Sequence, residues 1–288
     1  MTSLRYGHLG PAGTFTEEAA RRSVPDGDLV PYPSVRETVA AVLDGEIDAA
    51  LVPIENSLEG SVTTTIDALS AEPRLRMVGE VILAVRQCLI AGTELALDEI
   101  TEVRSHPQGL AQCARFLHDE MPGATLMPWS STAEAVRSLI EAPTTTAAIA
   151  AAAAASAQGG VILREAIEDD PGNETRFAWL SAKGDGPLIF TLGDGAPFKT
   201  SVLFAGDGDG KPGWLVRCLS EFAFRGVNLV KIESRPARSR LGHYVFFADC
   251  EGHEDDPAVA DAVEALAAHC DHVRILGSYR AAPTSPVS

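Results

Sequence analysis

Four places in the first half of the chain combine a short capping side chain with a Glu or Gln three positions later. The pairs are Thr14 with Glu17, Asn56 with Glu59, Ser105 with Gln108, and Ser131 with Glu134. Such a pair marks a helix start, where the capping oxygen accepts a hydrogen bond from a backbone N–H group. In an open α/β sheet the helix starts meet at the carboxyl ends of the strands, and their free N–H groups attract small anions. One copy predicts only an ordinary helix start, but four together favour a cleft that binds a small polycarboxylate.

Two groups of residues resemble a nucleotide site and a metal site, but neither has the required pattern. Gly7, Gly10 and Gly13 have the spacing G-x-x-G-x-x-G, which differs from the dinucleotide fingerprint, and the acidic partner expected later is not evident. His269 and His272 flank a predicted junction between a helix and a strand, so their side chains are expected to diverge. We therefore expect neither a metal nor an organic cofactor.

The composition argues against two classes of partner. The 288-residue chain has 23 Lys and Arg against 40 Asp and Glu, which gives a formal net charge of −17. Such a charge repels nucleic-acid backbones and anionic membranes. The five cysteines are odd in number and form no Cys-x-x-Cys pair, which is typical of a reducing compartment. Because the N-terminus also lacks a signal-peptide pattern, the sequence predicts a cytoplasmic protein.

The elements that position these residues are expected to form two domains. Within residues 5–157 short apolar runs alternate with amphipathic stretches, which predicts an α/β domain with parallel strands. Its Ala-rich segment is expected to form a short strand around Ile149 and then a helix that stops at Gly159. The segment 181–199 is dense in Gly and Pro, and we place the boundary there, with one domain at 1–185 and the other at 199–280.

The second domain has the element order βαββαβ. Its strands are expected at 200–205, 227–234, 243–250 and 273–278, and its helices at 214–225 and 258–269. Asp256 and Pro257 are a typical N-cap and first-turn pair for the second helix. This order is that of a split ferredoxin-like fold.

Six short segments carry a family resemblance. They are LGPAGTF at 9–15, VPIENS at 52–57, SHPQ at 105–108, NETRF at 173–177, GWLV at 213–216 and ESRP at 233–236. In this order, and over nearly the whole chain, they resemble prephenate dehydratases with a C-terminal ACT domain. The resemblance implies a two-lobed catalytic domain similar to periplasmic binding proteins, followed by a ferredoxin-like ACT domain. It also implies the decarboxylative dehydration of prephenate to phenylpyruvate in phenylalanine biosynthesis.

The resemblance assigns residues to the reaction. It places Thr175 at the leaving hydroxyl of the substrate, with Glu55, Asn56, Ser105 and Gln112 as further catalytic residues. A threonine hydroxyl is a poor acid, so Glu55, with a pKa raised by burial, is an alternative proton source.

Substrate binding is expected to involve Thr14, Ser57, Gln108, Arg176 and Phe177. The Arg176 guanidinium suits a carboxylate, and Phe177 would form a wall for the ring. The alternatives are a surface ion pair for Arg176 and a position in the core for Phe177. His106 is expected to pack or to cap a helix rather than act as a base, because a helix start disfavours the imidazolium.

In the ACT part, the resemblance implies a phenylalanine site between two paired domains. Its residues are expected to be Gly213, Leu215, Val216, Asn228, Glu233, Ser234, Arg235 and Pro236. Trp214 is a bulky residue at a position where the motif more often has alanine. Pairing would cover exposed sheet edges and give a homo-oligomer, either a dimer or a tetramer. Removal of the chain from about residue 199 is expected to leave catalysis and abolish inhibition by phenylalanine.

Two alternatives remain open. The substrate could be arogenate, in which an ammonium replaces the keto group of the side chain. The chain could also be a non-catalytic amino-acid sensor, because two-lobed clamps and ACT domains occur in binding proteins as well. The presence of Glu55, Asn56 and Thr175 together favours an enzyme.

Overall fold

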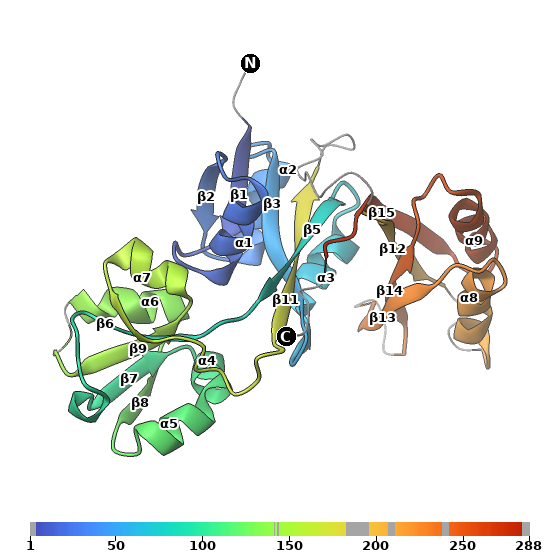
Figure 1. The fold of residues 1–288 in the computed structure, drawn as a ribbon. Coiled ribbons are helices and arrows are strands. Elements are labelled where there is room, and N and C mark those ends of the chain that lie inside the picture. The colour runs from blue at the N-terminus through green and yellow to red at the C-terminus, as the bar shows by residue number, and fades with distance from the viewer. Residues whose placement is uncertain are drawn as a thin grey trace.

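Three β-sheets organise the residues described by the computed structural model, which are 4–140, 142, 144–182, 196–206, 211–237 and 242–283. The N-terminal part has two lobes, and a C-terminal domain lies beside lobe 1 on the side away from lobe 2 (Figure 1). Lobe 1 therefore contacts both other units. No described helix has the length and apolar character that a membrane span needs.

Lobe 1 has a six-stranded sheet in the order β2-β1-β3-β11-β5, with β4 paired to β3. Its elements are β1 (Arg5–Leu9), α1 (Phe15–Ser23), β2 (Asp28–Tyr32), α2 (Val35–Leu43), β3 (Ala49–Asn56), β4 (Gly60–Ser61), α3 (Thr63–Ala71), β5 (Arg76–Ala84) and β11 (Glu174–Ser181). Strands β2 and β3 run parallel to β1, whereas β11 is antiparallel to β3 and β5. Within residues 5–157 the expectation of parallel strands thus holds for β1, β2 and β3 and is wrong for β4, which pairs antiparallel with β3. Strand β11 comes after that range, returns from lobe 2 and enters the sheet in the opposite direction.

Lobe 2 has a five-stranded sheet in the order β10-β6-β9-β7-β8. Its elements are β6 (Cys88–Ala91), η1 (Leu97–Glu99), β7 (Glu102–Ser105), α4 (Pro107–Gln112), α5 (Ala114–Glu120), β8 (Thr125–Pro128), α6 (Thr132–Arg137), η2 (Ser138–Ile140), β9 (Thr146–Ala150), α7 (Ala152–Gln158) and β10 (Val161–Arg164). The Ala-rich segment forms β9 and α7 as predicted, and Gly159 ends α7 with a left-handed φ of 78°.

Two segments connect the lobes, residues 85–87 from β5 to β6 and residues 165–173 from β10 to β11. Backbone hydrogen bonds join them, from Val85 N to Asn173 O at 2.8 Å and from Ile167 N to Gln87 O at 3.0 Å. Two such crossings give the two-lobed clamp that was predicted.

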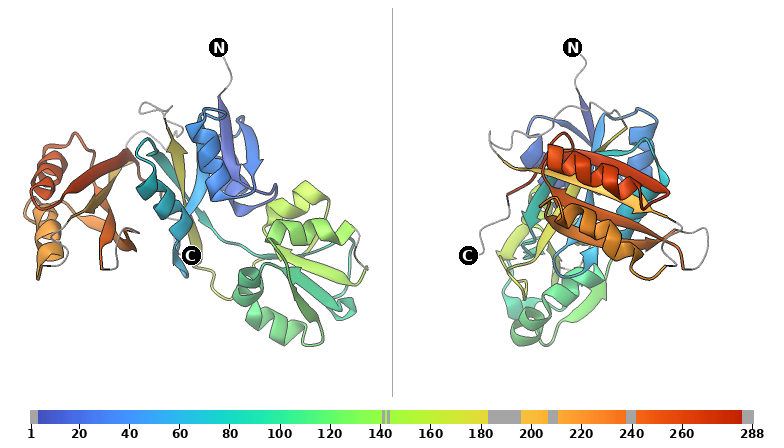
Figure 2. Two further views of the ribbon diagram at one scale, coloured as in Figure 1. Left: turned by 180° about the vertical axis from the view of Figure 1, so that it is seen from behind. Right: turned by 90° about the vertical axis from the view of Figure 1, so that its right-hand side faces the viewer.

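The C-terminal domain has an antiparallel sheet in the order β13-β14-β12-β15. Its elements are β12 (Phe198–Ala205), α8 (Trp214–Ala223), β13 (Leu229–Pro236), β14 (Tyr244–Glu251), α9 (Pro257–Ala267) and β15 (His272–Arg280). This confirms the βαββαβ order. The two helices cover the face of the sheet that is turned away from lobe 1 (Figure 2). Of the boundary segment predicted at 181–199, residues 183–195 lie outside the described residues.

The other face of this sheet shares a hydrophobic core with lobe 1. Leu203 and Phe247 belong to one buried cluster with Leu69 and Met77 of lobe 1. The two parts approach so closely at Gly277 that an added Cβ would lie 1.9 Å from the carbonyl oxygen of Met77. Only glycine fits there, so the domain contact is part of the fold of both units.

Candidate active site

A cavity of about 990 Å³ lies between the two lobes. Predicted site residues of both lobes line it: Thr14, Asn56, Thr175 and Phe177 from lobe 1, and Gln108 and Gln112 from lobe 2. The volume is at the upper end of the range for small-molecule sites. The cleft is therefore the candidate active site.

The β3–β11 ladder places Asn56 directly opposite Thr175 on the cleft side of the sheet. Asn56 Nδ2 donates to Thr175 Oγ1 at 3.0 Å and to Asn173 Oδ1 at 2.8 Å. Its Oδ1 accepts hydrogen bonds from the backbone N–H groups of Leu58 and Glu59, which fixes the orientation of the amide. Because Thr175 Oγ1 acts as the acceptor in this contact, its own hydrogen is left to donate to a group in the cleft.

Phe177 lies two positions after Thr175 and on the same face of β11, since side chains alternate along a strand. Its ring lines the cleft and is also packed in a buried cluster with Leu83 and Trp179. Phe177 therefore lies both at the wall of the cleft and in the core, and its contact with a substrate ring stays a prediction.

Arg176 points away from the cleft, on the face of β11 opposite to Thr175. Its Nε donates to Glu80 at 2.6 Å, its Nη1 to Asp249 at 2.6 Å and its Nη2 to Tyr279 at 2.8 Å. The contacts with Asp249 and Tyr279 join lobe 1 to the C-terminal domain, whereas Glu80 belongs to lobe 1 itself, and Arg176 is only 8% exposed. The prediction that Arg176 binds a substrate carboxylate is corrected, because other side chains already occupy its guanidinium.

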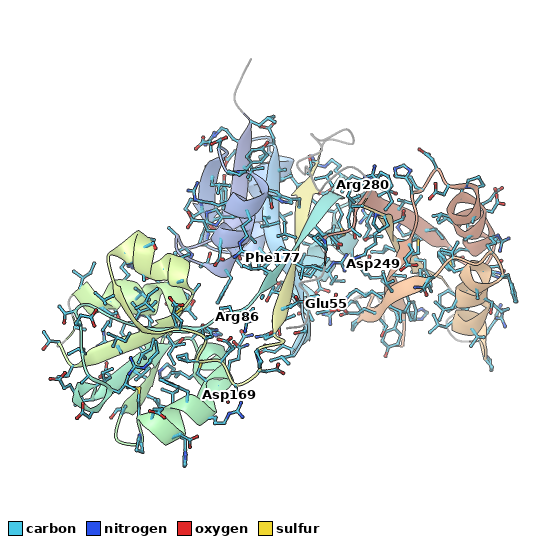
Figure 3. All side chains as sticks on the ribbon, viewed as in Figure 1. Glu55, Arg86, Asp169, Phe177, Asp249 and Arg280 are labelled. Carbon is cyan, nitrogen blue, oxygen red and sulfur yellow. The ribbon has the colours of Figure 1, made fainter. Side chains whose placement is uncertain are left out.

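Glu55 also faces the C-terminal domain. Its carboxylate lies 2.8 Å from Lys231 Nζ and 3.6 Å from Arg176 Nη1, and it does not line the cleft. Figure 3 shows Glu55 and Asp249 on one side of the strands and Phe177 on the other. The prediction of Glu55 as a buried acid beside the substrate is corrected, because its side chain points to the wrong face of β3.

Ser105 and Ser57 are near the cleft but do not line it. Ser105 is fully buried, and its Oγ donates to the carbonyl oxygen of Ile149 at 2.7 Å. Ser57 Oγ accepts from the backbone N–H of Glu174 at 3.0 Å. Both predicted roles are corrected to structural ones: Ser105 holds two strands of lobe 2 together, and Ser57 braces the start of β11.

On the lobe 2 side, Gln112 has a buried partner that the sequence did not indicate. Gln87 Nε2 donates to Gln112 Oε1 at 3.0 Å. The Oε1 atom of Gln87 is buried and has no hydrogen-bond partner among the described residues, although the residue lines the cleft. No motif surrounds Gln87, and only its place on the crossing segment 85–87 brings it to the site.

Two of the four predicted helix caps are confirmed at the cleft. Thr14 Oγ1 accepts from the backbone N–H of Glu17 at 3.4 Å, at the start of α1. Ser131 Oγ accepts from the N–H of Glu134 at 3.1 Å, at the start of α6.

The other two pairs differ from the prediction. His106 rather than Ser105 caps α4, and its ring accepts from the N–H of Gln108 at 3.3 Å, which confirms the capping role expected for His106. Asn56 caps a tight turn into β4 instead of a helix, because α3 begins only at Thr63.

The charges of the side chains that line the cleft decide how it can bind an anion. None of the described residues that line it is Lys or Arg, and Glu59 and Glu134 add negative charge. The helix starts at Thr14, His106 and Ser131 supply the positive ends of dipoles and backbone N–H groups. A small anion would therefore be bound mainly by neutral donors.

Comparison with known sequences identifies the family. The family model described as prephenate dehydratase matches residues 6–185, and the model of the ACT domain matches residues 207–268. This chain belongs to the prephenate dehydratase family. The prephenate dehydratase of Mycobacterium bovis is 37% identical over 299 residues, with 99% of this chain and 88% of the relative covered. The prephenate dehydratase of Bacillus subtilis is 37% identical over 283 residues, with 96% and 99% covered.

Solved structures agree with this assignment. The prephenate dehydratase of Arthrobacter aurescens in complex with L-Phe has a TM-score of 0.88 and 39% identity, with 99% of this chain and 92% of that chain covered. GqqA, described as a novel type of quorum quenching acylase, has a TM-score of 0.85 and 30% identity, with 96% and 98% covered. Because the fold occurs with two described activities, the family assignment rests on the sequence matches. Prephenate dehydratases are lyases, so the chain is an enzyme of that class.

In the ACT domain of this prephenate dehydratase family member, strand β13 alternates between two environments. Glu233 and Arg235 are partly buried toward lobe 1, and Arg235 Nε and Nη2 lie 3.1 and 3.3 Å from the Asp67 carboxylate oxygens. Ser234 and Pro236 are exposed. The ESRP segment at 233–236, the second ACT motif, thus contributes both to the domain contact and to an exposed surface.

The GWLV segment at 213–216, the first ACT motif, forms the start of α8. Gly213 has a left-handed φ of 78° as the N-cap residue. Trp214 is buried, and its Nε1 donates to the carbonyl oxygen of His269 at 2.6 Å. Its bulk therefore fills the core of the domain. The remaining predicted effector residues lie in the first turn of α8 and just before β13: Leu215, Val216 and Asn228.

Proposed function

We propose that the cleft converts prephenate to phenylpyruvate with loss of carbon dioxide and hydroxide. The observation that carries the proposal is the Asn56–Thr175 pair, in which Thr175 lines the cleft and accepts from Asn56, so that its own hydroxyl hydrogen is not used in this contact. Departure of the carboxylate as carbon dioxide supplies the electron pair that expels the 4-hydroxyl and completes the aromatic ring. The enzyme therefore has to stabilise the leaving oxygen.

Thr175 is the donor to that oxygen in this proposal, and Asn56 keeps Thr175 in place. A threonine hydroxyl stabilises developing negative charge through a hydrogen bond rather than by full proton transfer. One well-placed donor of this kind contributes about 10²–10³-fold to the rate. The Asn56 contacts support this role because they hold the donor in one orientation before substrate arrives.

The two carboxylates are assigned to the helix starts and the neutral amides of the cleft. The helices that begin after Thr14 and Ser131 approach from opposite lobes, and Gln108 and Gln112 add amide donors from lobe 2. Phe177 provides an apolar wall for the ring. Neutral donors are sufficient for a dianion when the site excludes water and the helix dipoles point at it.

Arogenate is the alternative substrate, and one observation supports this alternative. An ammonium needs acceptors, and the cleft offers the Glu134 carboxylate and Gln87 Oε1, which has no hydrogen-bond partner among the residues that the structure describes. Incubation of the purified protein with each compound separates the two: prephenate gives phenylpyruvate and arogenate gives phenylalanine. Formation of neither product, together with binding of phenylalanine, would support an amino-acid sensor instead.

We further propose that phenylalanine regulates the enzyme through the ACT domain, which we assign to residues 199–280, with catalysis assigned to residues 1–185. The structure of the Arthrobacter aurescens relative with L-Phe supports the effector. The residues assigned to bind it are Gly213, Leu215, Val216, Asn228, Glu233, Ser234, Arg235 and Pro236. Initial rates measured over a range of phenylalanine concentrations test this assignment.

We propose a homo-oligomer formed by pairing of ACT domains. On the face of the domain turned away from lobe 1, Val216 is 66% exposed, Phe224 80% and Ile232 47%. A second copy would cover these side chains and the edge strand β13. Light scattering of the wild type and of Phe224→Glu tests the surface, and dissociation of the variant is the expected result.

We also propose a cytoplasmic location. The support is the set of free thiols at Cys88, Cys113, Cys218, Cys250 and Cys270, which a reducing compartment preserves. Cell fractionation with an antibody to the chain tests the location.

A further inference from the structure

A buried charge cluster lies behind the catalytic strands, between lobe 1 and the C-terminal domain. Arg176 of β11 contacts Glu80 of β5 and Asp249 of β14, both of which are fully buried. Lys199 Nζ, at the start of β12, donates to Glu80 at 2.8 Å. Two cations and two carboxylates thus balance, which is the condition under which buried charges are tolerated.

Hydrogen bonds close a ring within this cluster. Arg176 donates to the Tyr279 oxygen at 2.8 Å and to Asp249 Oδ2 at 2.6 Å. Ser201 Oγ donates to the other carboxylate oxygen of Asp249 and lies 2.7 Å from the Tyr279 oxygen. Because the single Ser201 hydrogen goes to Asp249, the Tyr279 hydroxyl must donate to Ser201. Three of the four members of the ring belong to the C-terminal domain.

Tyr279 is able to keep this donor role over the physiological pH range. Complete burial, and after it the charge of Asp249, raise the pKa of the Tyr279 phenol well above its ordinary value. The phenol therefore stays neutral and retains its hydrogen.

The ring is one residue away from the proposed catalytic group. In the β3–β11 ladder Arg176 pairs with Glu55 and Thr175 pairs with Asn56. Each strand thus presents one residue to the cleft and the adjacent one to the C-terminal domain. A displacement of Arg176 changes the backbone that orients Thr175, because the two residues share a peptide bond.

A second contact of the same kind comes from the strand that carries the second ACT motif. Lys231 of β13 contacts Glu55 at 2.8 Å and donates to Ser61 Oγ at 2.7 Å. Ser61 lines the cleft. The C-terminal domain is therefore attached to both catalytic strands and to the short strand β4 beside them.

We propose that Arg176 is a positioning residue for Thr175, and that the ring of Arg176, Tyr279, Ser201 and Asp249 transmits the state of the C-terminal domain to the reaction. The proposal rests on the proposed role of Thr175. It predicts that loss of one ring hydroxyl changes turnover and the response to phenylalanine, whereas a purely structural ring would affect stability alone.

The test is the full-length Tyr279→Phe variant, which keeps the aromatic ring in the core and removes only the hydroxyl. We expect kcat to fall about 5-fold to 50-fold, within the range of ordinary coupling between sites, with KM changed by less than about twofold. The maximal inhibition by phenylalanine should fall as well. Ser201→Ala should act in the same direction and keeps the test available if Tyr279→Phe folds poorly. Arg74→Lys, at an exposed pair with Glu72, is the control and should leave kcat unchanged.

The combination with Arg176→Lys sharpens the result. Within one ring the two changes should be non-additive in kcat, so the double variant should resemble the more impaired single variant. A lower thermal midpoint with wild-type kcat and wild-type inhibition in both hydroxyl variants would overturn the proposal. Normal turnover in a Thr175 variant would instead refute the proposed catalytic role, so the two failures are distinguishable.

Discussion

The two faces of the β3–β11 ladder differ in chemistry although their residues alternate in the sequence. The cleft face carries Asn56 and Thr175, which are neutral, short and hydrogen-bonded to each other. The opposite face carries Glu55 and Arg176, which are charged and paired with the C-terminal domain. The proposed catalytic positions and the domain-contact positions are therefore adjacent residues of the same strands.

This difference explains how a chain with a net negative charge can bind a negatively charged substrate. A guanidinium in the cleft would bind the dianion strongly in the ground state, and such binding does not accelerate the reaction by itself. In the proposed mechanism neutral donors and helix starts bind the carboxylates less strongly, while the hydroxyl of Thr175 is placed where charge develops. The strong charges are used on the other face, where they join the two parts of the protein.

The largest effect is expected from removal of the C-terminal domain. A chain that ends after residue 182 would expose Leu69 and Met77, and Arg176 and Glu80 would keep only each other and lose their partners in the C-terminal domain. The loss should exceed the marginal stability of a domain, about 5–15 kcal/mol. We expect an unfolded or aggregated product without activity, measured by circular dichroism and by phenylpyruvate formation. From the sequence we expected catalysis to survive this truncation, and the shared core leads us to expect the opposite. A folded fragment with normal kcat would contradict the new expectation.

The next largest effect is expected from Asp249→Asn. The change leaves the buried cluster with one uncompensated positive charge, and removal of one partner from a buried pair costs about 3–5 kcal/mol. Urea unfolding measures the loss. Asp28→Asn is the control, because its pair with Arg5 is exposed, and pairs of that kind contribute only about 0–1 kcal/mol. Equal losses in the two variants would remove the distinction between the buried and the exposed pair.

On the cleft face, Asn56→Ala should lower kcat about 10²–10³-fold, because it releases the Thr175 donor from its fixed position. Asn56→Asp keeps the size of the side chain but adds a negative charge beside a dianion, and should in addition raise KM. Steady-state kinetics with prephenate distinguish the two variants. An Asn56→Ala enzyme with wild-type kcat would show that Thr175 needs no support from Asn56.

The smallest effect is expected from Ser131→Ala, which removes the cap of a helix start at the cleft. Loss of such a cap costs about 1 kcal/mol of stability, and the weaker anion site should raise KM about twofold to fivefold, an effect of the size of one helix-dipole contact. Ser34→Ala is a matched control, because Ser34 caps α2 in the same way and does not line the cleft. It should lower stability equally and leave KM unchanged. A similar KM in both variants would exclude the α6 start from substrate binding.

Features that depend only on neighbouring residues were predicted correctly from the sequence. The caps at Thr14 and Ser131, the Gly159 stop and the βαββαβ order all depend on neighbouring residues, and the structure confirms them. The antiparallel return of β11 depends on a connection between lobes that no local pattern contains.

The predictions that were wrong concern the direction of side chains. Arg176 and Glu55 belong to motifs whose neighbouring residues line the cleft, and both were assigned to the cleft with those neighbours. The alternation of a strand could have corrected this, because Thr175 and Arg176 must point to opposite faces. The partner Asp249 lies 73 residues further along the chain, so the reason for a buried Arg176 appears only when the domains are folded against each other.

The central claim is that the cleft face of this ladder performs the reaction through the Thr175 hydroxyl, and Thr175→Val tests it most directly. Valine has nearly the same shape as threonine and lacks the donor, so packing against the neighbouring residues is preserved. We predict that steady-state kinetics with prephenate give a kcat lowered about 10²–10³-fold with KM within about twofold of the wild type. A Thr175→Val enzyme with wild-type kcat would contradict the claim.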